Sequence, residues 1–168
     1  MSTFVTVGNS LYPFRRLLDE VARLASEGLL PAPIMVQHGH TPFSCAGCEP
    51  RALMDRVEFE SALDSAQLVI THGGLTVFRA MRAGKVPVVM PRRVGIGESA
   101  DDHQVDLTKP LADEGRIALA TEPAELRRAV TVALELQHHR PASSHEMAAV
   151  PLVLEIKDLL HEWSLTKR

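Results

Sequence analysis

The chain has 168 residues, of which 45% are hydrophobic and 23% are charged. A domain of this size buries about 70% of the surface that its unfolded chain exposes, so the composition indicates a globular protein and excludes general disorder. Its 18 Lys and Arg residues against 21 Asp and Glu leave a net charge of -3, with no long run of either sign. We therefore expect no nucleic-acid partner, because no basic stripe is available to neutralise a phosphate backbone.

Signals for export or membrane insertion are not evident in the sequence. The N-terminal MSTFVTVGNS has no basic segment with a cleavable apolar stretch, and no apolar run approaches the roughly 20 residues that span a bilayer. Two cysteines are too few for a disulfide framework. We expect a cytoplasmic protein that reaches the inner face of a membrane only through a surface or a partner.

The first part of the chain alternates between strand and helix signals. A β-branched and aromatic run over residues 3–7 ends at a Gly-Asn-Ser turn and predicts a strand. From Phe14 to Ala25 apolar residues recur at helical spacing, with Arg16 among the polar residues between them, which predicts an amphipathic helix that Gly28 ends. A second apolar run at 34–36 predicts a buried parallel strand.

The next segment is irregular before the alternation resumes. Residues 38–50 lack periodicity and predict a long surface loop, followed by a brief strand at 52–54. Asp55 and Glu58 have the spacing of a capping box, which predicts a helix of about three turns. The clearest buried strand covers residues 68–71 and ends at a pair of glycines.

The remaining elements complete an α/β pattern. Helices are expected at 76–83, 102–114, 123–136 and 150–163, strands at 86–90 and 117–120, and a loop at 92–100. Repeated strand-helix units predict a Rossmann-like doubly wound parallel sheet with helices on both faces. We expect a single nucleotide-sugar-binding domain over residues 1–168, with 145–168 as a C-terminal helical extension.

Ligands of open α/β sheets bind beyond the carboxyl ends of the strands. Three segments of the chain follow predicted strands there, beginning at Gly8 and Asn9, at His72, and at the arginine pair 92–93. The second segment is the strongest candidate, because its glycines permit close approach to a phosphate while the histidine and a threonine add donors. The alternative is that the glycines only make a tight turn.

The stretch QLVITHGGLTVFRAMRAGKVPVVMPRR, followed by DDHQVDLTKPLADEG, resembles the C-terminal, donor-binding half of family 28 glycosyltransferases, which have the GT-B architecture. The opening TFVTVGN looks like the start of single-domain members of that family. Those members include the catalytic subunit that adds the second N-acetylglucosamine to dolichol-linked chitobiose, and bacterial subunits of exopolysaccharide biosynthesis. The resemblance covers residues 3–120 and lies in the ordered set of motifs.

The resemblance implies a donor site built from three parts. The turn that begins at His72 would line the diphosphate, and the segment around residue 101 would bind hydroxyls of the transferred sugar. The loop at Gly8 and Asn9 is the third part. The expected donor-binding residues are Gly8, Asn9, His72, Gly73, Gly74, Thr76, Arg79, Asp101, Asp102 and Gln104. For Asp102 the alternative is an N-cap of the following helix.

Arg79 departs from the pattern of the family. Relatives carry at this position a glutamate that accepts hydrogen bonds from the ribose hydroxyls, and an arginine cannot accept a hydrogen bond. The contact must be lost or supplied by another group. Arg92 and Arg93 are candidates for contact with a phosphate or with the acceptor, the alternative being a solvated surface pair.

Four residues of types that bind zinc lie close together in the sequence, namely His38, His40, Cys45 and Cys48. A single CxxC is weak support for zinc, so we expect a pair of thiols and no metal. No cofactor is expected either. His38 and His40 are the candidates for a general base, without an assignment of that role.

These features lead to one function and two alternatives. The resemblance implies the donor-binding catalytic subunit of a split inverting glycosyltransferase, which transfers sugar from a UDP-sugar to a lipid-linked saccharide in polysaccharide or glycan assembly. Since a GT-B enzyme has two Rossmann-like domains, we expect a membrane-anchored partner subunit to supply the acceptor domain. The first alternative is a non-catalytic nucleotide-binding or scaffold protein. An unrelated Rossmann-like enzyme is disfavoured because no GxGxxG follows the first strand.

Overall fold

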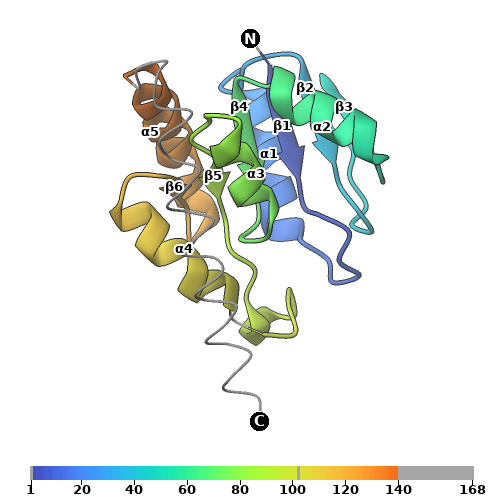
Figure 1. The fold of residues 1–168 in the computed structure, drawn as a ribbon. Helices are drawn as coiled ribbons and strands as arrows, with labels where there is room; N and C mark the ends of the chain where they lie inside the picture. The colour runs from blue at the N-terminus through green and yellow to red at the C-terminus, as the bar shows by residue number, and fades with distance from the viewer. Residues whose placement is uncertain (1, 102, 140–168) are drawn as a thin grey trace.

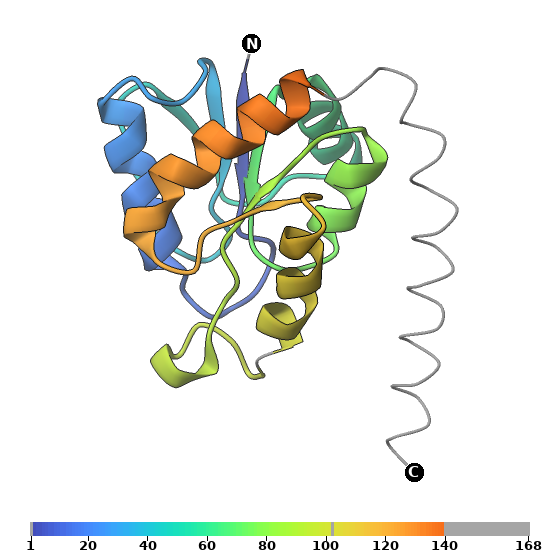
Figure 2. The same ribbon diagram turned by 90° about the vertical axis from the view of Figure 1, so that its left-hand side faces the viewer.

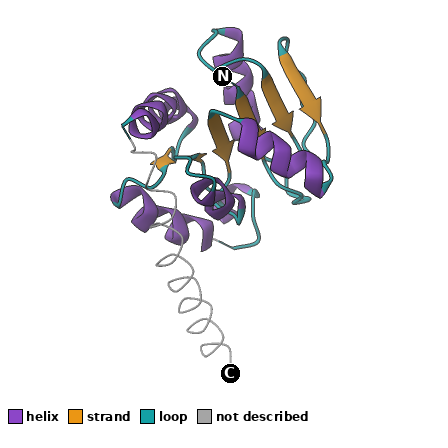
Figure 3. Cartoon of the chain, turned by 45° about the horizontal axis from the view of Figure 1, so that its top comes forward, coloured by secondary structure: helices purple, strands orange, loops and turns teal. Residues whose placement is uncertain are grey.

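The structure is a computed structural model that describes residues 2–101 and 103–139. Its sheet has six strands, all parallel, in the order β3-β2-β1-β4-β5-β6 (Figures 1 and 3). The strands are β1 (Thr3–Thr6), β2 (Ile34–Gln37), β3 (Cys48–Arg51), β4 (Leu68–Thr71), β5 (Val88–Val89) and β6 (Ala118–Leu119). The expected C-terminal extension and Asp102 lie outside the described residues.

Helices cover both faces of the sheet, as the doubly wound prediction requires (Figure 2). The elements are α1 (Arg15–Ser26), α2 (Arg56–Ser65), α3 (Thr76–Arg82), the short 3-10 helix η1 (Val94–Ile96), α4 (His103–Asp113), η2 (Pro123–Glu125) and α5 (Leu126–His138). Helices α1 and α5 share one apolar core with five of the strands, and Cys48 of β3 packs against its margin. Helices α2, α3 and α4 contribute to two smaller apolar clusters on the opposite face. The α/β Rossmann-like prediction is confirmed.

The ends of the helices show how local sequence and tertiary contacts combine. The capping box of α2 is present as predicted, with Asp55 accepting from the Glu58 amide at 2.9 Å. Helix α1 has no polar residue at its own N-cap, Phe14. The Thr41 hydroxyl accepts from the Phe14 amide at 2.9 Å instead, so the loop after β2 satisfies a donor at the start of α1.

Two details of the sequence prediction are wrong. The strand expected at 52–54 lies at Cys48–Arg51, because β3 is an edge strand of largely exposed residues that carries Pro50 and therefore lacks an apolar pattern. The amphipathic pattern, in which Arg16 is one of the polar residues between the apolar positions, would leave this side chain exposed, whereas it is only 12% exposed.

The strand order determines where a ligand can bind. From β1 the chain runs to β2 and β3 on one side of β1, and it then returns to β4 on the other side of β1. The crevice at the carboxyl ends of β1 and β4 is therefore the topological switch point, the place where doubly wound sheets bind ligands. Among the residues that the structure describes, no helix is long and apolar enough to cross a membrane.

Candidate functional site

The loops that follow β1, β4 and β5 meet at the switch point, at the lower end of the sheet in Figure 1. A Cβ added to Gly8, after β1, would lie 2.8 Å from Cε1 of His72, after β4. The guanidinium of Arg92, after β5, donates to the carbonyl of Val7 at 2.8 Å. Because these three loops are in direct contact, we call this region the switch-point site.

His72 is the central side chain of the switch-point site. Its ring lies between two glycines, since a Cβ on Gly74 would come within 2.5 Å of Nε2 and one on Gly8 within 2.8 Å of Cε1. Burial, and then the charge of Arg92, lower the pKa of His72 to about 4, although a hydrogen bond to the Thr6 backbone acts in the opposite direction. The imidazole is therefore neutral at pH 7 and brings no positive charge to a bound anion.

Gly73 and Gly74 have a packing role that the sequence did not reveal. A Cβ on Gly73 would lie 2.8 Å from Cβ of Gln104, so the missing side chain lets α4 approach the turn after β4. The absence of a Cβ on Gly74 leaves room for the imidazole of His72. Both glycines therefore have a structural reason to be present, whatever ligand they meet.

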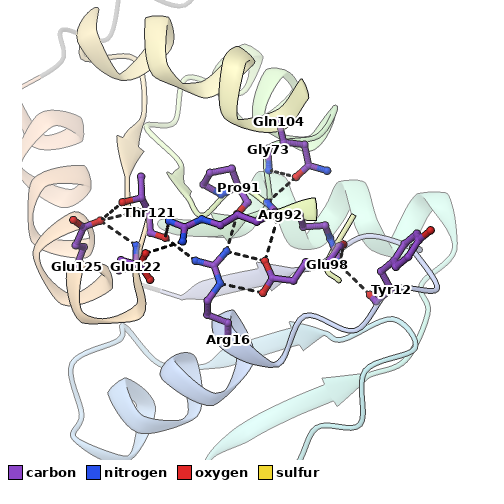
Figure 4. Close-up of polar contacts among 11 residues, drawn as sticks. Tyr12, Arg16, Gly73, Pro91, Arg92, Glu98, Gln104, Thr121, Glu122 and Glu125 are labelled. Atoms are coloured by element: carbon purple, nitrogen blue, oxygen red, sulfur yellow. Dashed lines mark hydrogen bonds and ion pairs between the residues drawn. The ribbon is translucent and has the colours of Figure 1, made fainter. Parts of the chain in front are cut away.

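Gln104 joins two of the loops. Its Oε1 accepts from the backbone amides of Gly73 and Arg92, both at 3.2 Å, and the residue is 7% exposed. Figure 4 shows its amide nitrogen directed away from these two bonds. The carbonyl end of Gln104 thus holds the site together, and the amide end is the part able to donate to a ligand.

Arg92 lies in the interior and does not form the expected exposed phosphate contact. It is 2% exposed, donates to the carbonyls of Tyr12 and Glu98 at 2.9 and 3.0 Å, and stacks 4.5 Å from the centroid of the Phe14 ring. Its buried Nε has no hydrogen-bond partner among the described residues. Burial lowers the pKa of Arg92 to about 10, opposed by Glu98, so the guanidinium stays charged at pH 7.

A buried ion pair fixes the loop after β5, and sequence reasoning missed it (Figure 4). Glu98 accepts from Nε and Nη2 of Arg16 at 3.0 and 2.8 Å, and its carboxylate also binds the Arg93 amide at 3.2 Å. Arg93 itself pairs with Glu122 at 2.7 Å and donates to the Thr121 carbonyl. No local pattern in the sequence marks Glu98, because its partners lie on other elements.

A chain of hydrogen bonds positions Asn9 at the exposed side of the switch-point site. Gln37, buried at the end of β2, donates to Oδ1 of Asn9 at 2.8 Å and accepts through Oε1 from the Thr6 hydroxyl. With its oxygen engaged, Asn9 keeps its amide protons for a ligand. Sequence reasoning did not select Gln37, although a polar residue at the end of the apolar run IMVQ was a signal for it.

The other predicted donor-binding residues lie around this centre. Thr76 is buried at the first position of α3, and Cζ of Arg79 lies 5.7 Å from the centroid of the Phe59 ring on α2. Asp101 is exposed and pairs with the exposed His103. The structure thus brings together the loop after β1, the turn after β4 and Gln104, whereas Arg79 packs toward α2.

The predicted zinc-type residues do not assemble. Nδ1 of His38 lies 2.8 Å from the carbonyl of Thr41, and Nδ1 of His40 lies 3.3 Å from that of Ser10. Over residues 2–101 and 103–139, no group of three or more His, Cys, Asp or Glu is placed to hold a metal ion. Since a carbonyl only accepts, both histidines carry hydrogen on Nδ1 in these bonds.

Exposed apolar side chains border the site. Leu11 is 79% exposed, Leu75 75% and Ile96 59%, with Tyr12 and Val94 less so, and they come from the loops after β1, β4 and β5. An apolar group of this size on three adjacent loops is typical of a surface that meets a partner or a ligand. We call these five residues the apolar rim.

Comparison with solved structures supports the fold class. The chain is similar to the glycotransferase of kitacinnamycin, with a TM-score of 0.61 and 19% identity over 88% of this chain and 37% of that one. It is also similar to MurG of Acinetobacter baumannii, with a TM-score of 0.57 and 20% identity over 91% of this chain and 49% of that one. No protein-family model matches the sequence, and no curated protein does.

The two solved structures are GT-B glycosyltransferases, and the chain spans less than half the length of each. Its six-stranded parallel sheet with helices on both faces is consistent with one half of the GT-B architecture. At these identities the similarity concerns the fold.

Proposed function

We propose that the chain is the donor-binding half of an inverting glycosyltransferase that uses a nucleotide diphosphate sugar, with uridine diphosphate as the nucleotide. The observation that carries the proposal is the switch-point site itself. Glycine-rich turns, the Asn9 amide and the Gln104 amide meet where doubly wound sheets bind ligands, in a fold shared with the glycotransferase of kitacinnamycin. The sequence resemblance to family 28 points to the same donor class.

The electrostatics of the site suit a diphosphate without a metal ion. Arg92 stays charged beneath the site. Within the described part of the chain its guanidinium donates to backbone carbonyls, including that of Glu98, whose carboxylate is paired with Arg16. A fixed charge in a low-dielectric interior acts on a nearby anion more strongly than one in water. In this proposal the side-chain amides of Asn9 and Gln104 donate hydrogen bonds to the nucleotide sugar. The charge of Arg92 stabilises the diphosphate without direct contact.

The reaction requires an acceptor hydroxyl on the face of the sugar opposite the diphosphate. Its oxygen forms a bond to the anomeric carbon while the bond to the diphosphate oxygen breaks, and a base takes the hydroxyl proton. Of the two candidate histidines, we assign this role to exposed His40. The hydrogen bond of its Nδ1 to the Ser10 carbonyl holds the ring beside the loop after β1, and in a neutral imidazole with this tautomer Nε2 is the acceptor.

We further propose that a partner subunit supplies the acceptor domain and brings the chain to a membrane that holds a lipid-linked saccharide, in exopolysaccharide or glycan assembly. The apolar rim supports a partner, because its exposed side chains lie on the three loops of the switch-point site, at the end of the sheet where a second wall of the cleft would stand. One Rossmann-like domain forms only one wall, and positioning the two reactants requires both.

A non-catalytic scaffold is the second candidate, and a specific observation favours it. Groups expected to bind the donor are engaged within the protein, since His72 packs between two glycines and Gln104 accepts from two backbone amides. Arg79, at the position where relatives bind the ribose, lies over Phe59. A scaffold needs these internal contacts and need not bind a nucleotide sugar.

Calorimetric titration with a UDP-sugar separates the two candidates. A donor domain binds, and Asn9→Ala weakens binding about 5-fold to 10-fold, which corresponds to roughly 1 kcal/mol for one lost hydrogen bond. Ser61→Ala, an exposed polar truncation on α2, serves as the matched control and leaves affinity unchanged. Absence of binding to the folded protein, or equal affinity of the two variants, contradicts the donor assignment and favours the scaffold.

A further inference from the structure

Cys45 and Cys48, the only two cysteines of the chain, close a tight turn that leads into β3. The Cys48 amide donates to the Cys45 carbonyl at 3.3 Å. A turn with this hydrogen bond keeps the Cα atoms of its end residues within about 7 Å, and disulfides join Cα atoms about 4.4–6.8 Å apart. The backbone of the reduced protein therefore already holds the two cysteines at bridging range.

The side chains are also arranged for contact and for access. The thiols are not covalently bonded to each other in the structure and each is half-buried, and the Cys45 thiol donates only weakly, to the backbone carbonyl of Ala46 at 3.3 Å. Ala46 and Gly47 between them are exposed, and no atom lies within 4 Å of the place where a Cβ on Gly47 would stand. A small reagent can thus reach the turn from solvent.

We propose that this pair is a dithiol site that reacts with small-molecule disulfides of the glutathione class to form a reversible Cys45–Cys48 disulfide. The thiolate of Cys45 attacks one sulfur of the reagent, which forms a mixed disulfide and releases one thiolate. Cys48, after losing its proton to solvent, attacks the sulfur of Cys45, and the second thiolate leaves. The protein loses two electrons and two protons, and the reagent is reduced to two thiols.

The surroundings of Cys48 fix the order of these steps. Burial, followed by the hydrogen bond and the charge of Cys45, raises the pKa of the Cys48 thiol to about 12. Cys48 also packs against the main apolar core, so we assign the other thiol, Cys45, as the attacking sulfur, because the thiolate and not the thiol is the nucleophile.

The test is incubation of the full chain with oxidised glutathione, followed by intact mass measurement and counting of maleimide-reactive thiols. The wild type is expected to lose both thiols, to carry no glutathione and to weigh two hydrogen atoms less, and dithiothreitol restores both thiols. Cys48→Ser is expected to retain one glutathione on Cys45, because no second thiol resolves the mixed disulfide.

Cys45→Ser is expected to react more slowly than Cys48→Ser, since burial still raises the pKa of its remaining thiol after the hydrogen bond and the charge of Cys45 are gone. Circular dichroism of each variant verifies that the fold is retained. Persistent glutathione on the wild type, two unreacted thiols, or disulfide-linked dimers in place of the intrachain bond would overturn the proposal. Equal rates for the two single variants would overturn the assignment of Cys45 as the attacking thiol.

Discussion

The neutral His72 at the centre of the switch-point site makes a quantitative prediction about stability and pH. In the unfolded chain this histidine takes up a proton near pH 6.5, whereas the folded protein holds its pKa at about 4. Between pH 4 and pH 6.5 the unfolded state binds more protons at His72 than the folded state does. The free energy of unfolding that depends on neutral His72 is therefore fully present above pH 6.5 and decreases as the pH falls toward 4. Below the folded pKa no further stability is lost.

The size of the effect follows from the two values. Lowering the pH from about 7.5 to about 5 should remove about 2 kcal/mol of unfolding free energy through this one group. Replacement His72→Asn removes the titration while leaving a side-chain donor near the position of Nδ1. The variant has a lower stability of its own, because the ring between the glycines is lost, so only the change between the two pH values is compared.

Urea unfolding of both proteins at the two pH values measures this difference. The wild type should lose about 2 kcal/mol more than His72→Asn on acidification, because the other titrating groups are common to both proteins. An equal loss in the two proteins would refute the burial argument. A pKa near 6.5 for His72 in the folded protein, measured by nuclear magnetic resonance, would refute it independently.

Three other substitutions test the packing of the site and its supports. Gly74→Val should lower the unfolding free energy by about 1–3 kcal/mol, because the new side chain meets the imidazole ring, whereas Gly95→Ala, with nothing within 4 Å of its Cβ, should have little effect in the same thermal melts. Thr41→Val should cost about 1 kcal/mol in urea unfolding by removing the acceptor at the start of α1, and Thr41→Ser should restore most of it. Glu98→Gln should cost roughly 3 kcal/mol in the same assay, since it leaves buried arginine charge without its carboxylate, and a loss below 1 kcal/mol would mean that the ion pair contributes little.

The fold was predictable from the sequence where burial leaves an unbroken apolar run or apolar residues at helical spacing. The run LVIT became β4 with all four residues buried, and the spacing of apolar residues after Phe14 gave α1. The edge strand β3 was misplaced because exposed strand residues carry no apolar signal and Pro50 argues against a strand. The buried strands were thus predictable from the sequence, whereas the exposed edge strand was not.

The candidate site was predictable only as a location. Strand ends and glycines indicated the turn at His72, since the topological rule depends on chain order alone. The sequence could not show that Arg92 is buried or that Glu98 pairs with Arg16 across 82 positions, because such pairs depend on tertiary contacts. It also suggested phosphate binding as the reason for Gly74, whereas the structure shows a packing reason.

Binding of a nucleotide at the switch-point site is the central claim, and a titration of the isotope-labelled protein with uridine diphosphate tests it most directly. Backbone amide shifts in two-dimensional nuclear magnetic resonance spectra should be largest and saturable at Gly8, Gly73 and Gly74, with the side-chain amides of the site following the same curve. Shifts centred instead on the cavity at the amino ends of the strands, beside Met35 and Ala66, would contradict the claim, as would the absence of any saturable shift.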